Sequence, residues 1–357
     1  MAGAASTGNQ VSFFYQISAA EFSQSNPLSL LPAHYQLQLI ADADIALGAN
    51  HALPLTPAAP FVIGNLSNSA VLRIFGANVG WAQLQQILQV LACEAALPGR
   101  CFQPHPQLAP ALELQLAVLP EPHVLAKLNT LAQAEEFELV CLTAVPTLSQ
   151  PGVLVMDMDS TAIQIECIDE IAKLAGTGEQ VAAVTARAMN GELDFAQSLL
   201  ARVATLQGAP ETILRQVLDA VPLMPGLTEL VQHLQHHQWQ VAIASGGFTY
   251  FTEALQQRLG LTATFANVLE IVDAKLTGKV LGDIVDATTK AQVVAELATQ
   301  YGITATQTVA IGDGANDIPM LNAAALGVAF HAKPKVQAQA KAAIRKGSLL
   351  QLLYLLD

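Results

Sequence analysis

The sequence predicts an α/β protein that has a Rossmann-like parallel sheet core with an inserted helical cap, plus a smaller N-terminal α+β domain. Three observations support this fold class. From Pro151 onward, short apolar runs alternate with amphipathic helical patterns, which is typical of a parallel sheet. A stretch with only helical patterns interrupts this alternation directly after its first strand. Before Pro151, the predicted elements follow the order strand, helix, strand, strand, helix, strand, which is ferredoxin-like.

The 357 residues are enough for two domains, and a proline-containing linker at Thr143–Gly152 separates them. We assign residues 1–150 to an N-terminal arm and the α+β domain, and residues 151–357 to the core. Residues 1 to about 70 are poor in charge and rich in Ala, Asn, Ser and Pro, so we expect an arm with irregular structure. The elements expected after the arm are the strands Val71–Phe75, Cys101–Phe102, Leu112–Leu119 and Phe137–Leu142 and the helices Trp81–Ala95 and Pro122–Ala134.

In the core, a helical cap of about residues 164–223 follows the first strand and would lie over its carboxyl end as a lid. A hairpin is expected to join Asn267–Val272 to Lys279–Ile284 through residues 273–278. The expected parallel strands are Val153–Met156, Val241–Ala244, Thr308–Ile311 and Gly327–Phe330, and the expected cap helices are Ile168–Leu174, Glu179–Met189, Asp194–Leu206 and Pro210–Ala220.

The composition excludes several classes of protein. A net charge of −13 argues against nucleic acid as a partner, because binding to its phosphates needs a basic surface. No Lys or Arg precedes Arg73, which argues against a secretory signal or transit peptide, and the apolar runs are too short to span a membrane. We therefore expect a cytoplasmic protein. Four thiols are expected to be reduced and structural: Cys93, Cys101, Cys141 and Cys167.

Two aspartates follow the most apolar strand. Val153–Met156 ends directly in Asp157, and Asp159 follows two positions later. Residues two apart on an extended segment point the same way, so both carboxylates can face one reacting centre. That centre would lie at the carboxyl end of a strand, where open α/β sheets bind ligands. The alternative is a polar loop in which Asp159 or Ser160 caps the next helix.

A second polar cluster, Ser245-Gly246-Gly247, follows the strand Val241–Ala244 and precedes a helix expected to start near Phe248. Exposed amides at a helix start bind anions, and glycine lets an anion approach the backbone closely. The same tripeptide occurs in ordinary turns, so it carries little weight by itself.

Lys290 is the third feature, because it lies near the start of a predicted helix, after Asp286-Ala287-Thr288-Thr289. The helix dipole disfavours a lysine in that place, and a bound anion between the two would remove the conflict. An ordinary surface lysine is the alternative.

The fourth cluster, Gly312-Asp313-Gly314-Ala315-Asn316-Asp317, follows the strand Thr308–Ile311. Two carboxylates and an amide in a glycine-hinged loop suit a hard cation that prefers oxygen ligands. A plain turn with Asp317 as the cap of the next helix is the alternative.

All four clusters follow or flank strands of one predicted sheet. Together they offer a nucleophile, hydroxyl and amide donors, a fixed cation and metal-binding carboxylates.

These motifs resemble a known family. D-x-D-S-T at Asp157–Thr161, the later Ser-Gly, the lysine and G-D-G-x-N-D mark the haloacid dehalogenase-like phosphotransferases, and within these the chain resembles the phosphoserine phosphatases. The likeness covers roughly Val153 to the last residue, and the first 150 residues resemble the family's variable N-terminal regions, including ACT-like domains. Further matching residues are Glu166-Cys167-Ile168-Asp169-Glu170, Met189, Phe195 and Arg202.

The resemblance implies hydrolysis of O-phospho-L-serine to L-serine and phosphate, the last step of serine biosynthesis, with Mg²⁺ as cofactor. Asp157 would be the nucleophile that forms an aspartyl-phosphate, and Asp159 would act first as acid and then as base. Mg²⁺ would be bound by the Asp157 carboxylate, the Asp159 backbone carbonyl and Asp313, with Asp317 supporting them from behind.

The resemblance also implies which residues bind the substrate. In the cap, Glu166 can accept from the ammonium group, and Arg202 can hold the carboxylate through two parallel donors. Without the resemblance, the cap residues would have ordinary roles at a helix start, on a solvated helix face or in a core. The expected set is Glu166, Met189, Phe195 and Arg202 in the cap, and Ser245, Gly246, Lys290 and Asn316 around the phosphoryl group.

Two other functions remain open at this point. The same chemistry could serve a phosphatase or phosphotransferase for a related small phosphate ester. Alternatively, the chain could be a non-enzymatic amino-acid sensor in which the N-terminal domain matters most. The sequence leaves open whether that domain binds serine or forms a homodimer.

Overall fold

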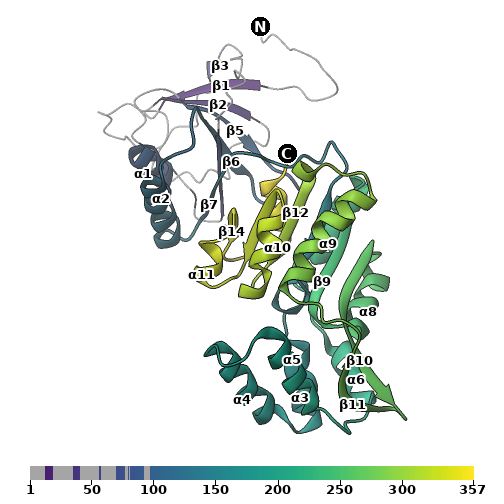
Figure 1. Ribbon diagram of the computed structural model, residues 1–357. Coiled ribbons are helices and arrows are strands. Elements are labelled where there is room, and N and C mark those ends of the chain that lie inside the picture. The colour runs from purple at the N-terminus through teal and green to yellow at the C-terminus, as the bar shows by residue number, and fades with distance from the viewer. Residues whose placement is uncertain are drawn as a thin grey trace. The chain divides into compact units, whose positions relative to one another are not determined.

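The computed structural model describes residues 13–18, 35–40, 56–57, 70–76, 79, 81–91 and 97–357. The chain forms two compact units (Figure 1). Unit 1 comprises Met1–Val145 and Leu353–Leu355, and unit 2 comprises Pro146–Leu352 and Leu356–Asp357. The described residues of each unit include one seven-stranded sheet.

Unit 1 contains the predicted ferredoxin-like arrangement. Its strands lie in the order β5-β6-β4-β7, and every neighbouring pair is antiparallel. Alternate residues of β4, such as Leu72 and Ile74, are buried in one core with apolar residues of the two helices. The bounds are β4 Ala70–Phe75, α1 Trp81–Leu91, β5 Leu97–Phe102, β6 Ala111–Leu116, α2 Pro122–Ala134 and β7 Glu138–Leu142. Residues 92–95 of the predicted first helix lie outside the described residues.

Two of the remaining alternate positions, Arg73 of β4 and Glu113 of β6, bury charge. The Arg73 guanidinium pairs with Glu113 at 2.8 Å, and both side chains are inaccessible to solvent or nearly so. Arg73 also donates to the backbone carbonyl of Tyr354 at 2.8 Å, and the Tyr354 ring stacks on Phe75. Leu353–Leu355, at the far end of the chain, therefore contribute to the interior of unit 1.

The expectation of an irregular arm is wrong for three segments of the first 70 residues. The strands β1 (Phe13–Ser18), β2 (Tyr35–Ile40) and β3 (Thr56–Pro57) extend the sheet beyond β5 in the order β3-β1-β2-β5. Tyr35–Ile40 alternates Gln with Leu, which is a strand pattern, but the polar and proline-rich surroundings outweighed it in the prediction. The rest of the predicted arm lies outside the described residues.

Unit 2 confirms the predicted parallel sheet. The strand order is β11-β10-β9-β8-β12-β13-β14, and all pairs from β10 to β14 are parallel. All four residues of β8 are fully buried, as its lack of polar side chains predicts. Because β8 lies between β9 and β12, the residues that follow these three strands meet at one sheet edge. The bounds are β8 Val153–Met156, β9 Gln240–Phe248, β12 Thr308–Gly312, β13 Leu326–Phe330 and β14 Ala342–Ile344.

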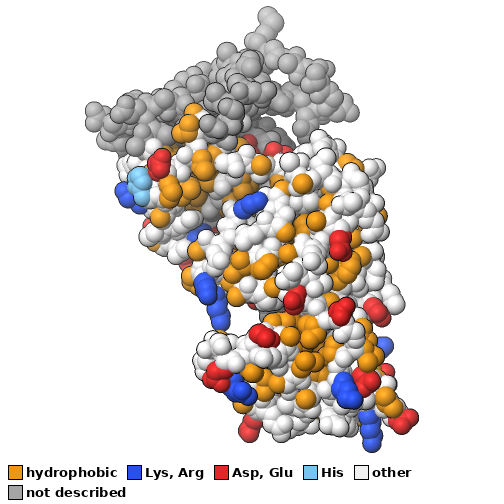
Figure 2. Space-filling view, viewed as in Figure 1, with side chains coloured by type: hydrophobic (Ala, Val, Ile, Leu, Met, Phe, Trp, Pro, Cys, Tyr) orange, Lys and Arg blue, Asp and Glu red, His pale blue; other side chains and the backbone are white. Residues whose placement is uncertain are grey.

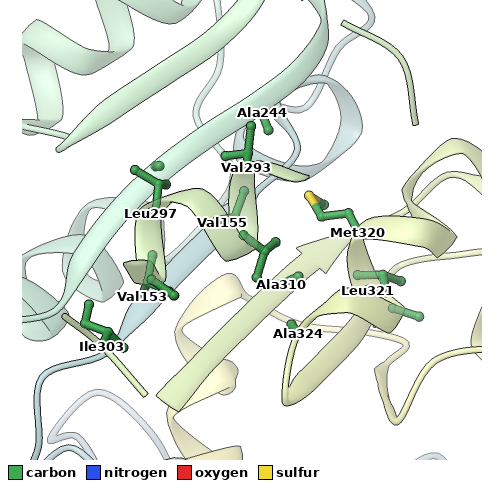
Figure 3. Close-up of a cluster of buried hydrophobic side chains, with 14 of the residues drawn as sticks. Val153, Val155, Ala244, Val293, Leu297, Ile303, Ala310, Met320, Leu321 and Ala324 are labelled. Carbon is green, nitrogen blue, oxygen red and sulfur yellow. The ribbon is translucent and has the colours of Figure 1, made fainter. Parts of the chain in front are cut away.

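Two helices cover one face of this sheet. Figure 3 shows Val153 and Val155 of β8 packed beside Val293 and Leu297 of α9 (Ala287–Gln300). The neighbouring strands present alanines toward the same cluster, and α10 (Ile318–Ala323) adds Met320. Small side chains on the strands let the helices approach closely, which brings the first turns of α9 under the end of β8.

The predicted helical cap is confirmed. It leaves the core after Ile163 and returns at Leu223, and these two residues pair as an antiparallel bridge. Figure 1 shows α3, α4 and α5 grouped beyond one end of the sheet of unit 2. A capping box between Asp194 and Gln197 starts α5. The cap helices are α3 Cys167–Ala175, α4 Gly178–Met189, α5 Phe195–Ala204 and α6 Thr212–Ala220.

The hairpin exists, but its predicted loop is wrong. β10 (Ala263–Val272) and β11 (Lys275–Leu281) are joined by two residues, Asp273 and Ala274, with φ of 52° and 56°. Two consecutive left-handed residues make the tight turn that a two-residue hairpin requires. Asn-Gly or Asp-Gly would have signalled it, whereas Asp-Ala does not. The sequence-based prediction therefore places the start of the second strand at Lys279 instead of Lys275.

On the face shown in Figure 2, acidic and basic side chains of the described residues are scattered among uncharged ones. Among the described residues no helix combines the length and apolar character needed to cross a membrane. Cys141 and Cys167 are free thiols, and burial raises the pKa of Cys141 to about 11. The side chains of the other two cysteines are outside the described residues.

Candidate active site

The four polar clusters lie together in unit 2. A cavity of about 370 Å³ opens between the ends of the central strands and the cap, and both contribute to its walls. Lys290 and Asp317 are not part of its lining; both are buried, and Lys290 contacts both Asp157 and Asp317. The predicted site residues that line the cavity are Asp157, Asp159, Glu166, Met189, Phe195, Arg202, Ser245, Gly246, Asp313 and Asn316.

A buried lysine joins two aspartates below the cavity. Lys290 Nζ donates to Asp157 Oδ1 at 2.6 Å and to Asp317 Oδ1 at 2.8 Å. Burial alone would lower the pKa of Lys290, but the two carboxylates outweigh it and raise that pKa above the ordinary value. Burial and the nearby Asp317 raise the pKa of Asp157, although Lys290 opposes them. The group formed by Lys290, Asp157 and Asp317 thus has one positive and two negative charges, so it attracts a further cation.

Three carboxylates fit a metal ion. Ligand oxygens of Asp157, Asp313 and Asp317 lie within 4.8 Å of one another. Both oxygens of Asp317 already accept hydrogen bonds, from Lys290 and from the Gly314 amide at 2.9 Å. Among the described residues, Asp157 Oδ2 accepts none. An all-oxygen donor set of this kind suits a hard divalent cation, and the hydrogen bonds of Asp317 leave Asp157 and Asp313 as the more available carboxylates.

The alternative role of Asp317 as a helix cap is not what its side chain does. Asp317 directly precedes α10, but its carboxylate makes no capping hydrogen bond to that helix. It points instead to Lys290 and back to Gly314. A Cβ on Gly312 would lie 2.6 Å from the Asp317 side chain, so only glycine leaves room for this conformation.

Asp159 lies at the cavity and also meets the start of the cap. Its Oδ1 accepts from the amide of Cys167, the first residue of α3, at 3.0 Å, so part of the predicted alternative, a capping role, also holds. A Cβ on Gly247 would lie 2.9 Å from Asp159 Oδ2, which explains the glycine. Burial, and then the charge of Glu166, raise the pKa of Asp159 to about 7. A carboxyl group of this kind can both hold and release a proton near neutral pH.

The two hydroxyls after Asp159 have contacts that the sequence did not predict. Ser160 has a left-handed φ of 56°, and its hydroxyl donates to Glu166 Oε1 at 2.8 Å. The Thr161 hydroxyl donates to Asp313 Oδ1 at 3.2 Å. Ser160 thus orients a cap residue, and Thr161 orients Asp313, one of the three carboxylates that fit a metal ion.

The Ser-Gly-Gly segment is part of a strand rather than a turn. β9 continues through Phe248, and the helix α8 (Thr249–Leu259) begins directly afterwards. Ser245 is buried, and its Oγ accepts from the Gly247 amide at 2.9 Å, which leaves the hydroxyl proton available. A Cβ on Gly246 would lie 2.6 Å from the ring of Phe195 in the cap. Gly246 is therefore required by the close approach of the cap.

The cap side of the cavity carries one unpaired cation. Arg202 is half-buried, and the only hydrogen bond of its guanidinium among the described residues is a 3.4 Å donation to the Ser198 carbonyl. Burial lowers the pKa of Arg202, although three acidic groups oppose this effect. Met189 is 71% exposed, so it is not a core residue, and the cavity lies against it. A guanidinium held in this way is suited to a ligand carboxylate.

Sequence reasoning missed several lining residues, although one signal was available. In α5, Phe195 and Arg202 share a helix face with Ser198 and Leu199, at spacings of three, four and seven residues. Extending the two predicted positions along that face would have found the other two. Further lining residues without an assigned role are Ile168, Thr185, Ala188, Leu193, Asp194, Gly247, Phe248 and Gly314.

Comparisons with known proteins agree with this geometry. Residues 152–325 match the family of haloacid dehalogenase-like hydrolases. Over 221 residues the chain is 58% identical to a phosphoserine phosphatase of Vibrio cholerae, which covers 62% of this chain and 67% of the relative. The chain is also similar to the unliganded crystal structure of a probable phosphoserine phosphatase of Vibrio cholerae. That likeness has a TM-score of 0.68 at 46% identity, over 80% of this chain and 86% of the other.

A third likeness is to another solved structure. A solved phosphoserine phosphatase, described as a phospho-aspartyl intermediate analogue, is 37% identical, with a TM-score of 0.55 over 58% of this chain and all of the other. The motifs, the parallel sheet with its cap, and these likenesses all point to one family. The chain is an enzyme that belongs to the phosphoserine phosphatases, within the haloacid dehalogenase-like hydrolases.

Proposed function

We propose that the chain catalyses Mg²⁺-dependent hydrolysis of O-phospho-L-serine to L-serine and phosphate through an aspartyl-phosphate on Asp157. The observation that carries the proposal is one cavity with two complementary ends. At one end lies Asp157, with an oxygen that accepts no hydrogen bond from the described residues. At the other lies Arg202, a guanidinium without an ion pair among those residues. A small molecule with a phosphate and a carboxylate fits this pair of ends.

The chemistry splits one difficult displacement into two easier ones. The Asp157 carboxylate forms a bond to phosphorus while the bond from phosphorus to the seryl oxygen breaks, and Asp159 gives that oxygen a proton. Asp159 then takes a proton from the water that attacks the aspartyl-phosphate, so that phosphate leaves and Asp157 is regenerated. The solved relative with a phospho-aspartyl intermediate analogue supports this route.

Positive charge and hydrogen-bond donors stabilise the negative charge of the phosphoryl oxygens. Mg²⁺, held by the Asp157 carboxylate, the Asp159 backbone carbonyl and Asp313, supplies positive charge to these oxygens when bound. Asp317 supports the set from behind through Lys290 and Gly314. The donors proposed for the phosphoryl oxygens are the Ser245 hydroxyl, the Gly246 amide, the third Lys290 proton and the Asn316 side chain.

The cap gives the substrate its identity. Glu166 accepts a hydrogen bond from the substrate ammonium. The Ser160 hydroxyl holds the Glu166 carboxylate in place by donating to Glu166 Oε1 at 2.8 Å. Arg202 donates two parallel hydrogen bonds to the substrate carboxylate. Met189 and Phe195 exclude water from the aliphatic part of the substrate. In this proposal the protein acts in the cytoplasm at the last step of serine biosynthesis, and unit 1 serves serine binding or formation of a homodimer.

Arg202→Lys should raise KM for phosphoserine by about 10- to 100-fold, because one ammonium cannot replace a planar pair of donors. The expected change in kcat is small, since Arg202 lies at the end remote from phosphorus. Steady-state phosphate release measures both constants, and phosphoethanolamine, which lacks the carboxylate, is the control substrate. Equal KM values for phosphoserine in the variant and the parent would remove Arg202 from the substrate site.

The proposed function is tested by phosphate release from O-phospho-L-serine. Activity should be absent after treatment with a chelator and should return on addition of MgCl₂. A panel of small phosphate esters, with and without alcohol acceptors, separates hydrolysis of phosphoserine from action on a related ester and from phosphoryl transfer. Preference for another ester, or formation of a phosphorylated acceptor as the main product, would contradict the proposal.

A further inference from the structure

We propose that Asn267 is a positioning residue that holds the Ser245–Gly247 segment and the start of α9 in register around a single phosphoryl group. The proposal rests on the proposed function, because it deepens the description of the phosphoryl end of the cavity. Asn267 lies in β10, is 1% exposed and does not line the cavity. It therefore acts through other residues.

The Ser245–Gly247 segment bulges out of the sheet. Phe265 of β10 pairs with Ala244 of β9, whereas Asn267 pairs with Phe248. Three residues of β9 thus face a single residue of β10. Backbone groups in such a bulge lose their ladder partners, and buried backbone groups need replacements. The Asn267 side chain supplies one, because its Nδ2 donates to the Gly246 carbonyl at 2.8 Å.

This hydrogen bond reaches Ser245 through one peptide group. The Gly246 carbonyl and the Gly247 amide belong to the same plane and point in opposite directions. The carbonyl accepts from Asn267, and the amide donates to Ser245 Oγ at 2.9 Å. Fixing the plane at one side therefore fixes it at the other. The Ser245 oxygen is held as an acceptor, so its proton is directed to a different partner.

The other end of the Asn267 amide reaches the segment that leads into α9. Asn267 Oδ1 accepts from the Val285 amide at 2.9 Å. The next residue, Asp286, caps α9 through the Thr289 amide, and its carbonyl accepts from the Lys290 amide at 3.0 Å. One buried side chain thus connects the hydroxyl at Ser245 with the first turn that carries Lys290.

The connection matters because the two donors come from different parts of the sequence. Ser245 lies in β9, and Lys290 lies 45 positions later, beyond a hairpin and a loop. Misplacing a catalytic group by about 1 Å can cost about 100-fold in rate. A buried amide that donates to one segment and accepts from the other fixes their separation without entering the cavity.

The test compares Asn267→Ala and Asn267→Asp with the control Gln307→Ala. Asn267→Asp keeps the acceptor for Val285 but replaces the donor to Gly246 with a carboxylate. Gln307 is also a buried amide that bridges two segments, accepting from the Thr147 amide and donating to its carbonyl, yet it does not line the cavity. Each protein is assayed for kcat and KM with phosphoserine, for inhibition by inorganic phosphate and by L-serine, and for melting temperature.

Both Asn267 variants should lose about 10- to 100-fold in kcat. They should also lose affinity for inorganic phosphate, with inhibition by L-serine unchanged. Gln307→Ala should melt earlier and keep all kinetic constants. The proposal fails if Asn267 variants only melt earlier, or if they weaken phosphate and serine alike. If Asn267→Ala does not fold, Asn267→Asp carries the test.

The outcome is separable from that of the proposed function. Calorimetric titration of the Mg²⁺-loaded proteins with inorganic phosphate reports on the phosphoryl end without any turnover. Loss of phosphate affinity in Asn267→Asp supports the positioning role even if phosphoserine is not the substrate. Equal phosphate affinity in Asn267→Asp and the parent, or no affinity in either, overturns it.

Discussion

Asp157→Asn should abolish turnover, with a loss of at least about 10⁴-fold in kcat, because an amide oxygen is a poor nucleophile toward phosphorus. Asparagine keeps the size of the side chain, and its oxygen can still accept from Lys290 and the Met158 amide, as Asp157 Oδ1 does. The fold should therefore persist. Rapid quenching during turnover, followed by mass analysis of peptides, should find phosphate on Asp157 of the parent and on no residue of the variant.

The variant also provides its own controls. Its circular dichroism and melting temperature should stay close to those of the parent. Inorganic phosphate should still bind, since Ser245 and Lys290 are unchanged. Substantial turnover by a freshly prepared, fully amidated variant, or a phosphorylated peptide that lacks Asp157, would refute the nucleophile assignment.

Lys290→Met should be both inactive and unstable. The lysine is fully buried between Asp157 and Asp317, at 2.6 and 2.8 Å. Removing one partner from a buried ionic group costs about 3–5 kcal/mol, because the remaining charge is neither solvated nor paired. Here two carboxylates would be left together. The midpoint of urea unfolding in metal-free buffer should fall clearly, and kcat should fall as well.

A second substitution separates the two effects. In Lys290→Met/Asp317→Asn, one of the stranded carboxylates is neutral, so part of the lost stability should return. Activity should not return, because the cation beside the nucleophile is still missing. A midpoint for Lys290→Met equal to that of the parent would contradict the buried ion group, and recovery of activity in the double variant would contradict the role of Lys290.

The strand-end motifs could be predicted because each one directly follows an apolar run. β8 carries no polar residue until Asp157, so its burial and direction are encoded locally. The residues between the motifs could not be predicted in the same way. The role of Asn267 depends on a bulge in the neighbouring strand β9. The pairing register that creates this bulge is a tertiary property that one strand alone does not encode.

The less predictable parts of the fold share a physical cause. Asp273 and Ala274 adopt left-handed conformations that their residue types do not predict. Packing of the hairpin therefore overrides the local backbone preference for negative φ. The strands in the first 70 residues lie in segments whose composition favours irregular structure. Arg73 and Glu113 look like ordinary alternating positions of a half-exposed sheet, and only tertiary structure buries them.

The inclusion of Leu353–Leu355 in unit 1 has a consequence for how the protein is made. Residues near Arg73 leave the ribosome long before Tyr354, whose carbonyl and ring complete their surroundings from 281 positions later in the chain. The charged interior of unit 1 therefore remains only partly satisfied until Tyr354 has been synthesised.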